Sequence, residues 1–208
     1  MSIKLYKGDL PDAFDWSDAR DACVAVDSET LGLNPHRDAL CVVQLSLGHG
    51  DAHLVQIDRT TFNAPRLTAL LGDPSITKIF HFARFDVAMF QNWLGAETTP
   101  LYCTKIASKL TRTYTDRHGL KDLLKESLGV DLSKQQQSSD WGAETLSDAQ
   151  KSYAASDVLH LHDAKAWLDE RLNREGREDI AMKCFDFLPH RTTLDLMGWQ
   201  GTDIFAHS

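Results

Sequence analysis

The pattern of apolar and polar positions divides the chain into a strand-rich first half and a helix-rich second half. Short stretches rich in β-branched residues and bounded by polar or Gly/Pro/Asn segments are typical of strands. They predict strands at residues 22–29, 40–47, 52–58 and 77–83, with a shorter one near residue 101. The first two are a predicted hairpin, because turn formers fill residues 32–38 between them.

Apolar residues spaced three and four apart predict helices at residues 65–71 and 85–94, and a mostly helical chain after residue 104. The clearest helical pattern is at residues 147–172, where Ser147 and Gln150 match a capping box. The order of strands and helices predicts an α/β fold with a mixed sheet. The last 30 residues are too apolar for a free tail, so we expect them to dock on the body.

Composition indicates an ordinary globular protein. A chain of 208 residues, 42% hydrophobic and 25% charged, is typical of one soluble domain. No segment approaches the roughly 20 apolar residues of a membrane helix, and the start lacks the apolar segment of a signal peptide. We therefore expect a cytoplasmic protein without membrane contact. The four cysteines form no CxxC pair, which predicts reduced core residues.

The net charge of -8 argues against a general basic surface that coats nucleic acid. One window is different, because residues 105–125 hold six basic and two acidic side chains. Such a window is typical of solvated helix faces. It also suits a surface that guides a phosphate backbone and makes binding dependent on salt.

Asp27 and Glu29 close the first predicted strand. Strand side chains alternate, so these two carboxylates share a face and Ser28 points away, where we expect it to matter little. Two like charges about 4 Å apart repel by roughly 1 kcal/mol in water and more when half-buried. A shared proton, a basic partner or a metal cation would compensate. A chance surface pair is the other interpretation, since the chain has 30 acids.

Two further segments place acids in apolar surroundings. Asp86 follows a buried strand, where an unpaired acid is costly and where a helix N-terminus could also stabilise it. Tyr153 and Asp157 are four apart and share a helix face, either as part of a site or at the edge of the core. If the segments converge, four carboxylates need cations, and oxygen ligands favour Mg²⁺ or Mn²⁺.

These segments together resemble a known family. The sequences DSE at residues 27–29, HFARFD at 81–86 and YAASD at 153–157 resemble the three motifs of the DEDDy 3'-5' exonucleases, and the chain is similar to ribonuclease D. The resemblance covers roughly residues 20 to 172. Further positions match in the stretch before the last motif: Lys134, Ser139, Asp140, Trp141, Leu146 and Gln150.

The resemblance implies a ribonuclease H-like fold, with a mixed sheet of about five strands flanked by helices. It implies an exonuclease domain at residues 1–172 and a C-terminal extension at 173–208 that packs on it, without the helical nucleic-acid-binding domains of longer ribonuclease D proteins. Two divalent ions, Mg²⁺ or Mn²⁺, would be held by Asp27, Glu29, Asp86 and Asp157. Tyr153 would orient the attacking water.

The implied reaction is hydrolysis of the terminal phosphodiester at single-stranded RNA 3' ends, which releases nucleoside 5'-monophosphates. Substrate-binding candidates fall in two sets: Thr30, Leu31, His81 and Phe85 for the terminal nucleotide, and Lys105, Arg112 and Lys121 for the backbone. His81 is equally well interpreted as a core histidine bonded to a main-chain carbonyl.

Three other functions compete with this one. A DNA exonuclease resembling the exonuclease domain of the Werner-syndrome helicase would carry the same motifs, although we expect RNA to be favoured. A non-catalytic nucleic-acid-binding module would be expected to lose an acid. A phosphatase with an Asp-x-Asp motif is disfavoured by Glu29.

Overall fold

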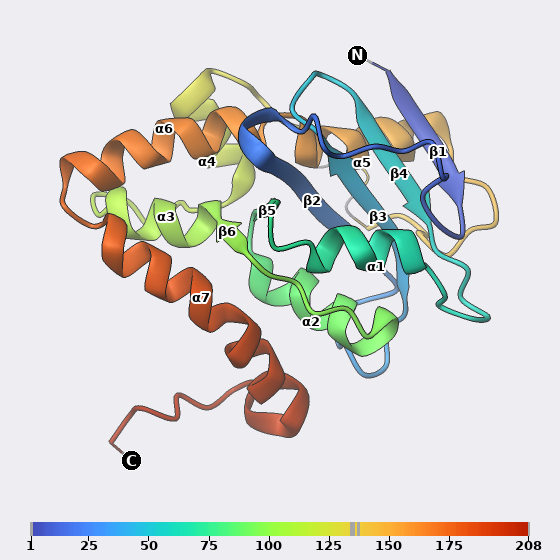
Figure 1. Ribbon diagram of the computed structural model, residues 1–208. Helices are drawn as coiled ribbons and strands as arrows, with labels where there is room; N and C mark the ends of the chain where they lie inside the picture. The colour runs from blue at the N-terminus through green and yellow to red at the C-terminus, as the bar shows by residue number, and fades with distance from the viewer. Residues whose placement is uncertain (1, 134–135, 137, 208) are drawn as a thin grey trace.

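A single mixed sheet of six strands organises the computed structural model, which describes residues 2–133, 136 and 138–207 (Figure 1). Lys134 of the ribonuclease D-like stretch lies outside the described residues. The strands are β1 (Ile3–Lys7), β2 (Cys23–Thr30), β3 (Leu40–Ser46), β4 (Ala52–Gln56), β5 (Thr77–Phe80) and β6 (Leu101–Cys103). Their order across the sheet is β1-β4-β3-β2-β5-β6. β3 runs antiparallel to both of its neighbours, and the other pairs are parallel.

The sheet confirms the five predicted strands and the hairpin of β2 with β3, and it adds β1. β1 pairs in parallel with β4 at the edge of the sheet, with Lys4 opposite His53. Its sequence, IKLYK, mixes partly buried and exposed side chains, and it lacks the long apolar run of the central strands. β3, by contrast, is buried along its whole length.

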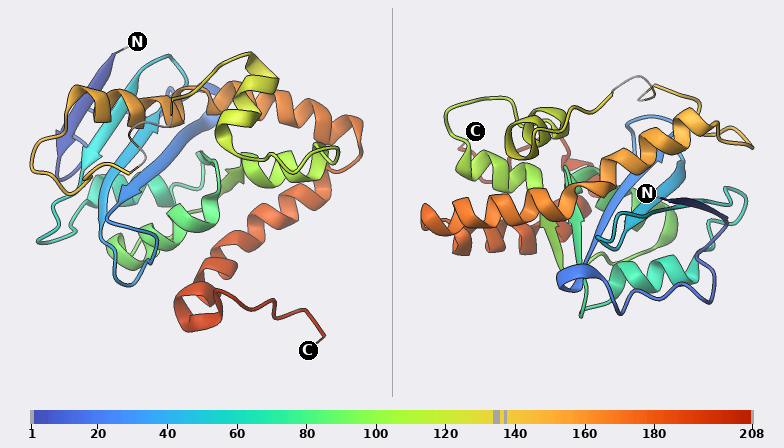
Figure 2. Two further views of the ribbon diagram at one scale, coloured as in Figure 1. Left: turned by 180° about the vertical axis from the view of Figure 1, so that it is seen from behind. Right: turned by 90° about the horizontal axis from the view of Figure 1, so that it is seen from above.

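Helices cover both faces of the sheet. They are α1 (Pro65–Gly72), α2 (Ala83–Leu94), α3 (Thr104–Thr111), α4 (Leu120–Leu128), α5 (Asp148–Leu159), α6 (Leu161–Arg174) and α7 (Glu178–Leu194), with short turns at Arg20–Ala22 and Asp195–Trp199. α5 lies on one face, and α1 and α2 lie on the other (Figures 1 and 2). α3, α4 and α6 pack together beside the β6 end, and α7 contacts α2, α3 and β6. No helix in the described ranges is long and apolar enough to span a bilayer.

The helical pattern at residues 147–172 forms two helices, which corrects the expectation of one continuous helix. Ser147 caps α5 and exchanges bonds with Gln150, which confirms the predicted capping box. The chain then bends at His160, whose φ of -108° and ψ of 1° are not helical. The imidazole of His162 lies 2.9 Å from the carbonyl of Cys23, so the first turn of α6 is tied to β2.

Residues after α6 pack on the body of the molecule. Phe185 of α7 is buried, and its ring lies 4.6 Å from that of Tyr102. Asp195, at the end of α7, accepts two bonds from the Arg84 guanidinium of α2, at 2.6 and 2.8 Å. All four cysteines are free, as the sequence predicts, and three of them are buried, whereas Cys184 is only half-buried and departs from the predicted core position.

Candidate active site

β2 presents Asp27 and Glu29 on one face of the sheet. Asp27 lies opposite Gln44 and Glu29 opposite Val42 on β3, and the register shifts immediately after Glu29. The apolar residues before them, residues 23–26, are buried, so β2 carries the two carboxylates out of the core. The Gln44 amide lies 3.5 Å from Glu29 Oε1, which makes it the nearest polar neighbour on the adjacent strand.

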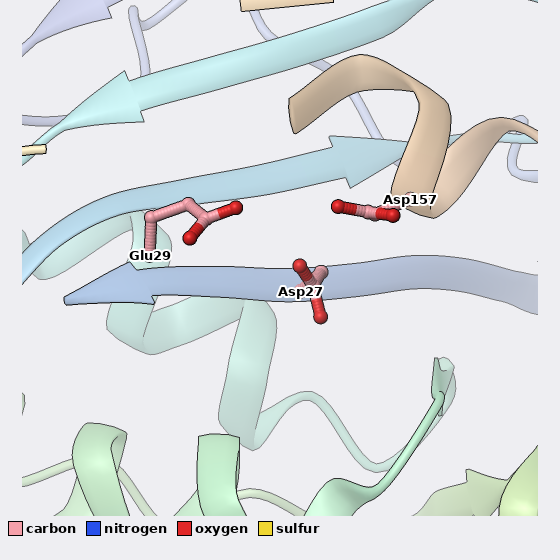
Figure 3. A group of neighbouring side chains, drawn as sticks. All are labelled: Asp27, Glu29 and Asp157. Carbon is pink, nitrogen blue, oxygen red and sulfur yellow. The ribbon is translucent and has the colours of Figure 1, made fainter. Parts of the chain in front are cut away.

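α5 brings a third carboxylate to this pair. Oxygens of Asp27, Glu29 and Asp157 lie within 4.8 Å of one another, and Figure 3 shows Asp157 on α5 facing the two acids of β2. Tyr153 lies one turn earlier on α5 and lines the same cleft. Its ring packs against the buried Trp141, with 6.0 Å between ring centroids.

Asp86 stands beside this group but outside it. It lies in the first turn of α2 with 3% of its surface exposed, and its Oδ1 accepts a bond of 2.6 Å from the Ser28 hydroxyl. Ser28 does point away from Asp27 and Glu29, as expected, but it is not a minor residue, because it holds the fourth acid. The sequence signal was present in the strand alternation, which sends Ser28 toward the face that α2 covers.

Burial raises the pKa of all four acids, and repulsion by neighbouring carboxylates adds to the effect for Asp27, Glu29 and Asp86. The pKa of Glu29 rises to about 9. Asp86 and Asp157 reach a pKa of about 7, although the Ser28 bond to Asp86 and the Tyr153 bond to Asp157 act in the opposite direction. Burial and the nearby carboxylates also raise the pKa of the Tyr153 phenol, which stays protonated at neutral pH.

The donor set fits a hard divalent cation. Within the described ranges none of the four acids forms an ion pair with a Lys, Arg or His side chain. A basic partner therefore does not compensate the repulsion between the acids, which leaves a shared proton or a metal cation. Three carboxylates within 4.8 Å supply only oxygen ligands, which suit Mg²⁺ or Mn²⁺ and not zinc.

A cleft of about 650 Å³ opens over these acids. It is lined by six of the seven residues predicted to bind substrate: Thr30, Leu31, His81, Phe85, Lys105 and Lys121. Gly142 makes room for Leu31 at its rim, because a Cβ added there would lie 2.8 Å from Leu31 Cδ2. The sequence did not single out Leu120, Leu132 or Ser138, which also line the cleft, since nothing in their local pattern marks them.

Arg112 does not reach the cleft, which corrects its predicted role in binding. Its side chain is 2% exposed, and its guanidinium donates to Glu126 at 2.6 Å and to the Arg117 carbonyl at 2.7 Å. A buried guanidinium that is paired with Glu126 inside the protein is not available to a phosphate. Lys121 does line the cleft and pairs with Asp131 at 3.0 Å near the surface.

His81 lines the cleft with a ring that is mostly covered. Its Nδ1 lies 2.9 Å from the Thr104 hydroxyl, which in turn donates to the Phe80 carbonyl. Burial, followed by the Lys105 charge, lowers the pKa of His81 to about 3. The ring is therefore neutral at physiological pH, so it offers hydrogen bonds and not a positive charge.

The mixed sheet and the carboxylate cluster suit a metal-dependent nuclease, and a match to a known family identifies which class of nuclease it is. The family model described as 3'-5' exonuclease matches residues 11–173, so the chain belongs to this 3'-5' exonuclease family and is a hydrolase with the ribonuclease H-like fold. The family is dependent on divalent metals.

Individual relatives confirm the resemblance to ribonuclease D. The chain is 35% identical over 160 residues to ribonuclease D of Gluconacetobacter diazotrophicus, which covers 77% of this chain and 40% of that protein. Brucella melitensis NrnC with bound Mg²⁺ is 56% identical, with a TM-score of 0.93 over the whole of both chains. NrnC bound to pGG is 58% identical, with a TM-score of 0.94 over the same extent.

Proposed function

We propose that the chain is an exoribonuclease that hydrolyses the terminal phosphodiester of single-stranded RNA 3' ends and releases nucleoside 5'-monophosphates. The observation that carries this proposal is the group of Asp27, Glu29 and Asp157, with oxygens within 4.8 Å, at the floor of an open cleft. In the reaction a water oxygen attacks phosphorus, and the bond from phosphorus to the 3' oxygen breaks.

Each acid has a proposed role in holding the metal ions. Asp27, Glu29 and Asp157 would bind them directly, and Asp86, held by Ser28 and close enough to raise the pKa of Asp27, would complete the set. Two divalent ions, when bound, would supply positive charge to the attacking water and to the leaving oxygen. The chain's contribution is to hold the carboxylates together at the cost of their repulsion.

Tyr153 would orient the attacking water. It lines the cleft one turn from Asp157 and keeps its proton, so its hydroxyl can donate as well as accept. Trp141 packs against its ring, which restrains the position of the phenol. Leu31, His81 and Phe85 would contact the terminal nucleotide, since they line the same cleft.

The substrate's length and sugar are part of the proposal. The complex of Brucella melitensis NrnC with pGG supports pGG as one substrate of this chain. We place the catalytic function in residues 1–172 and assign residues 173–208 to a packed extension. A cytoplasmic location stays a prediction, and cell fractionation would test it.

Cleavage of matched single strands tests the proposal. Purified protein is incubated with 5'-labelled RNA and DNA heptamers and with pGG, in Mg²⁺, in Mn²⁺ and in EDTA. We expect shortening of RNA from the 3' end in either metal and none in EDTA. Asp157→Asn should reduce the rate at least about 100-fold, because a metal ligand is lost.

Asp148→Asn is the matched control. Asp148 lies on the same helix, fully exposed and paired with Lys151, so its rate should equal that of the wild type. Shortening of DNA but not RNA would favour the DNA exonuclease. No metal-dependent cleavage of any strand would favour a binding module and reject the proposed reaction.

A further inference from the structure

Phe82 adopts a backbone conformation that its side chain disfavours. Its φ of 78° and ψ of 46° lie in the left-handed region, immediately before α2. A Cβ is strained there, and glycine or asparagine is the usual occupant. The side chain is also 45% exposed, so core packing does not explain why an aromatic ring is retained.

The ring of Phe82 has one specific partner. Lys105 Nζ lies 4.4 Å from the ring centroid, a distance at which the face of the ring attracts a cation. In the described parts of the chain Lys105 forms no ion pair with an acid. The ring is therefore the group that restrains the ammonium.

Lys105 occupies a position that helix electrostatics disfavours. It is the second residue of α3, where the positive end of the helix dipole repels a cation. Its side chain lines the cleft, and its charge is the second cause, after burial, of the lowered pKa of His81. The ammonium thus lies near the cleft wall at a site where an anionic ligand would stabilise it.

We infer that Phe82 is a positioning residue that holds the Lys105 ammonium at the mouth of the cleft, where the ammonium binds a backbone phosphate of the substrate. This inference rests on the proposed function, because it takes the anion to be an RNA phosphate. A free lysine side chain samples many rotamers, so a ring that restrains it lowers the entropy lost on binding. The strain at Phe82 is then retained for the ring and not for the fold.

Phe82→Gly separates this role from a structural one. Glycine relieves the left-handed strain, so the melting temperature should equal that of the wild type or rise by up to about 4 °C. The KM for the RNA heptamer should rise about fivefold with kcat within about twofold, as expected when one weak restraint on a phosphate contact is lost. A fall in kcat with an unchanged KM overturns the inference.

Two variants that keep the Cβ provide matched controls. Phe82→Tyr retains the ring face and should leave KM near the wild-type value. Phe82→Leu retains size and backbone strain but has no ring, and its KM should match that of Phe82→Gly. Equal KM values for Tyr and Leu would show that bulk, and not the ring, is what matters, and would overturn the inference.

A double-mutant cycle tests whether Phe82 acts through Lys105. Lys105→Met alone should raise KM about tenfold and lower the salt dependence of RNA binding. Phe82→Gly added to Lys105→Met should change KM by less than about twofold, because the restrained group is already absent. Independent, multiplicative effects would overturn the inference.

Equilibrium binding keeps the test separate from catalysis. The affinity for a fluorescent RNA heptamer is measured by anisotropy in EDTA, where cleavage does not occur. Absence of metal-dependent cleavage by the wild type would reject the proposed reaction, while an affinity lowered about fivefold by Phe82→Gly would still support the inference. The inference is overturned if the wild-type protein does not bind the RNA. It is also overturned if neither Phe82→Gly nor Lys105→Met changes the affinity.

Discussion

Ser28 lies in sequence between two carboxylates but acts on a third. Its hydroxyl donates to Asp86 Oδ1 at 2.6 Å, and both side chains are buried. A hydrogen bond to a charged group is worth about 1.5–3 kcal/mol, and it favours the ionised acid against the effect of burial. The bond therefore favours the ionised form that the proposed role of Asp86 as a metal ligand requires.

Removing this bond should alter the pH dependence of cleavage. In Ser28→Ala the pKa of Asp86 should rise further above its present value of about 7. The acidic limb of the pH–rate profile should then move to higher pH, with a rate at pH 7 about tenfold lower. Ser28→Thr keeps the hydroxyl and should retain the wild-type profile. An Ala variant with an unshifted acidic limb would contradict the assignment.

The raised pKa values also predict how the metal-free protein responds to pH. Glu29 titrates at about 9 in the folded chain against 4.5 ordinarily, so the folded state holds a proton that the unfolded state has lost. A raised pKa stabilises the folded state fully at pH values below the ordinary pKa of the group. This stabilisation is lost as the pH rises through the pKa that the group has in the folded state. For Glu29 the loss extends from about pH 4.5 to 9.

We expect the free energy of unfolding in EDTA to fall between pH 6.5 and 8.5, where the buried histidines are already neutral. Glu29→Gln should reduce the slope by about 1 kcal/mol per pH unit. Urea unfolding at the two pH values measures this slope, and Asp148→Asn should keep the wild-type slope. Equal slopes in wild type and Glu29→Gln would refute a pKa of Glu29 raised by burial and by the neighbouring carboxylates.

Mg²⁺ replaces the protons, so its stabilising effect should grow with pH.

The sequence pattern predicts which acids lie at the site better than it predicts which basic residues do. Strand alternation and helix periodicity place Asp27, Glu29 and Asp157 together, because each pattern fixes a face. Arg112 follows the last turn of α3, where the local sequence is compatible with a side chain in solvent or with one that points into the protein. Its partner Glu126 lies 14 residues away, so the inward turn depends on how α4 packs.

At the scale of elements, one acid joins the C-terminal turn to α2, the helix that carries Asp86. Asp195 receives the Arg84 guanidinium through two bonds and also pairs with Arg191 at 2.6 Å. Arg84 lies in the first turn of α2, two residues before Asp86. The residues after α6 therefore support the position of the fourth acid.

Asp195→Asn should lower stability, because two guanidinium groups lose their shared anion. The expected loss is about 2 kcal/mol, or several degrees in melting temperature. Asp186→Asn on α7 is the control, since that side chain is exposed and its removal should change neither value. Calorimetry of the two variants measures the difference, and equal melting temperatures would show that the Arg84 contact adds nothing.

Elements with strong periodicity were predictable, and their interruptions were not. The apolar stripe continues across residue 160, so the sequence predicts one helix where α5 and α6 meet at an angle. The bend places His162 beside the Cys23 carbonyl, a contact made through β2, about 140 residues earlier. Edge strand β1 was missed for a related reason, since its partner β4 supplies the pairing that its own pattern does not show.

At the scale of the whole molecule, a net charge of -8 coexists with a cleft that carries basic side chains at its rim. The negative net charge would repel RNA, so the proposed binding would depend on a few local cations whose effect is screened by salt. Lys105 and Lys121 line the cleft, whereas Arg112 is inside the protein. The basic window of the sequence thus divides into residues that line the cleft and are proposed to bind RNA, and a residue with a structural role.

Substitution of Lys121 and Arg112 by uncharged glutamine should separate the residue proposed to bind RNA from the structural one. Lys121→Gln should weaken RNA binding and reduce the slope of log affinity against log salt by about 0.7, since one phosphate contact is lost, with little change in stability because its pair with Asp131 is exposed. Arg112→Gln should instead lower the free energy of unfolding by about 3 kcal/mol, because Glu126 loses a buried partner, and should leave the salt slope of the folded protein unchanged. Anisotropy titrations at several salt concentrations, paired with urea unfolding, measure both quantities. A salt slope reduced equally by the two variants would mean that the Arg112 guanidinium turns outward when RNA binds.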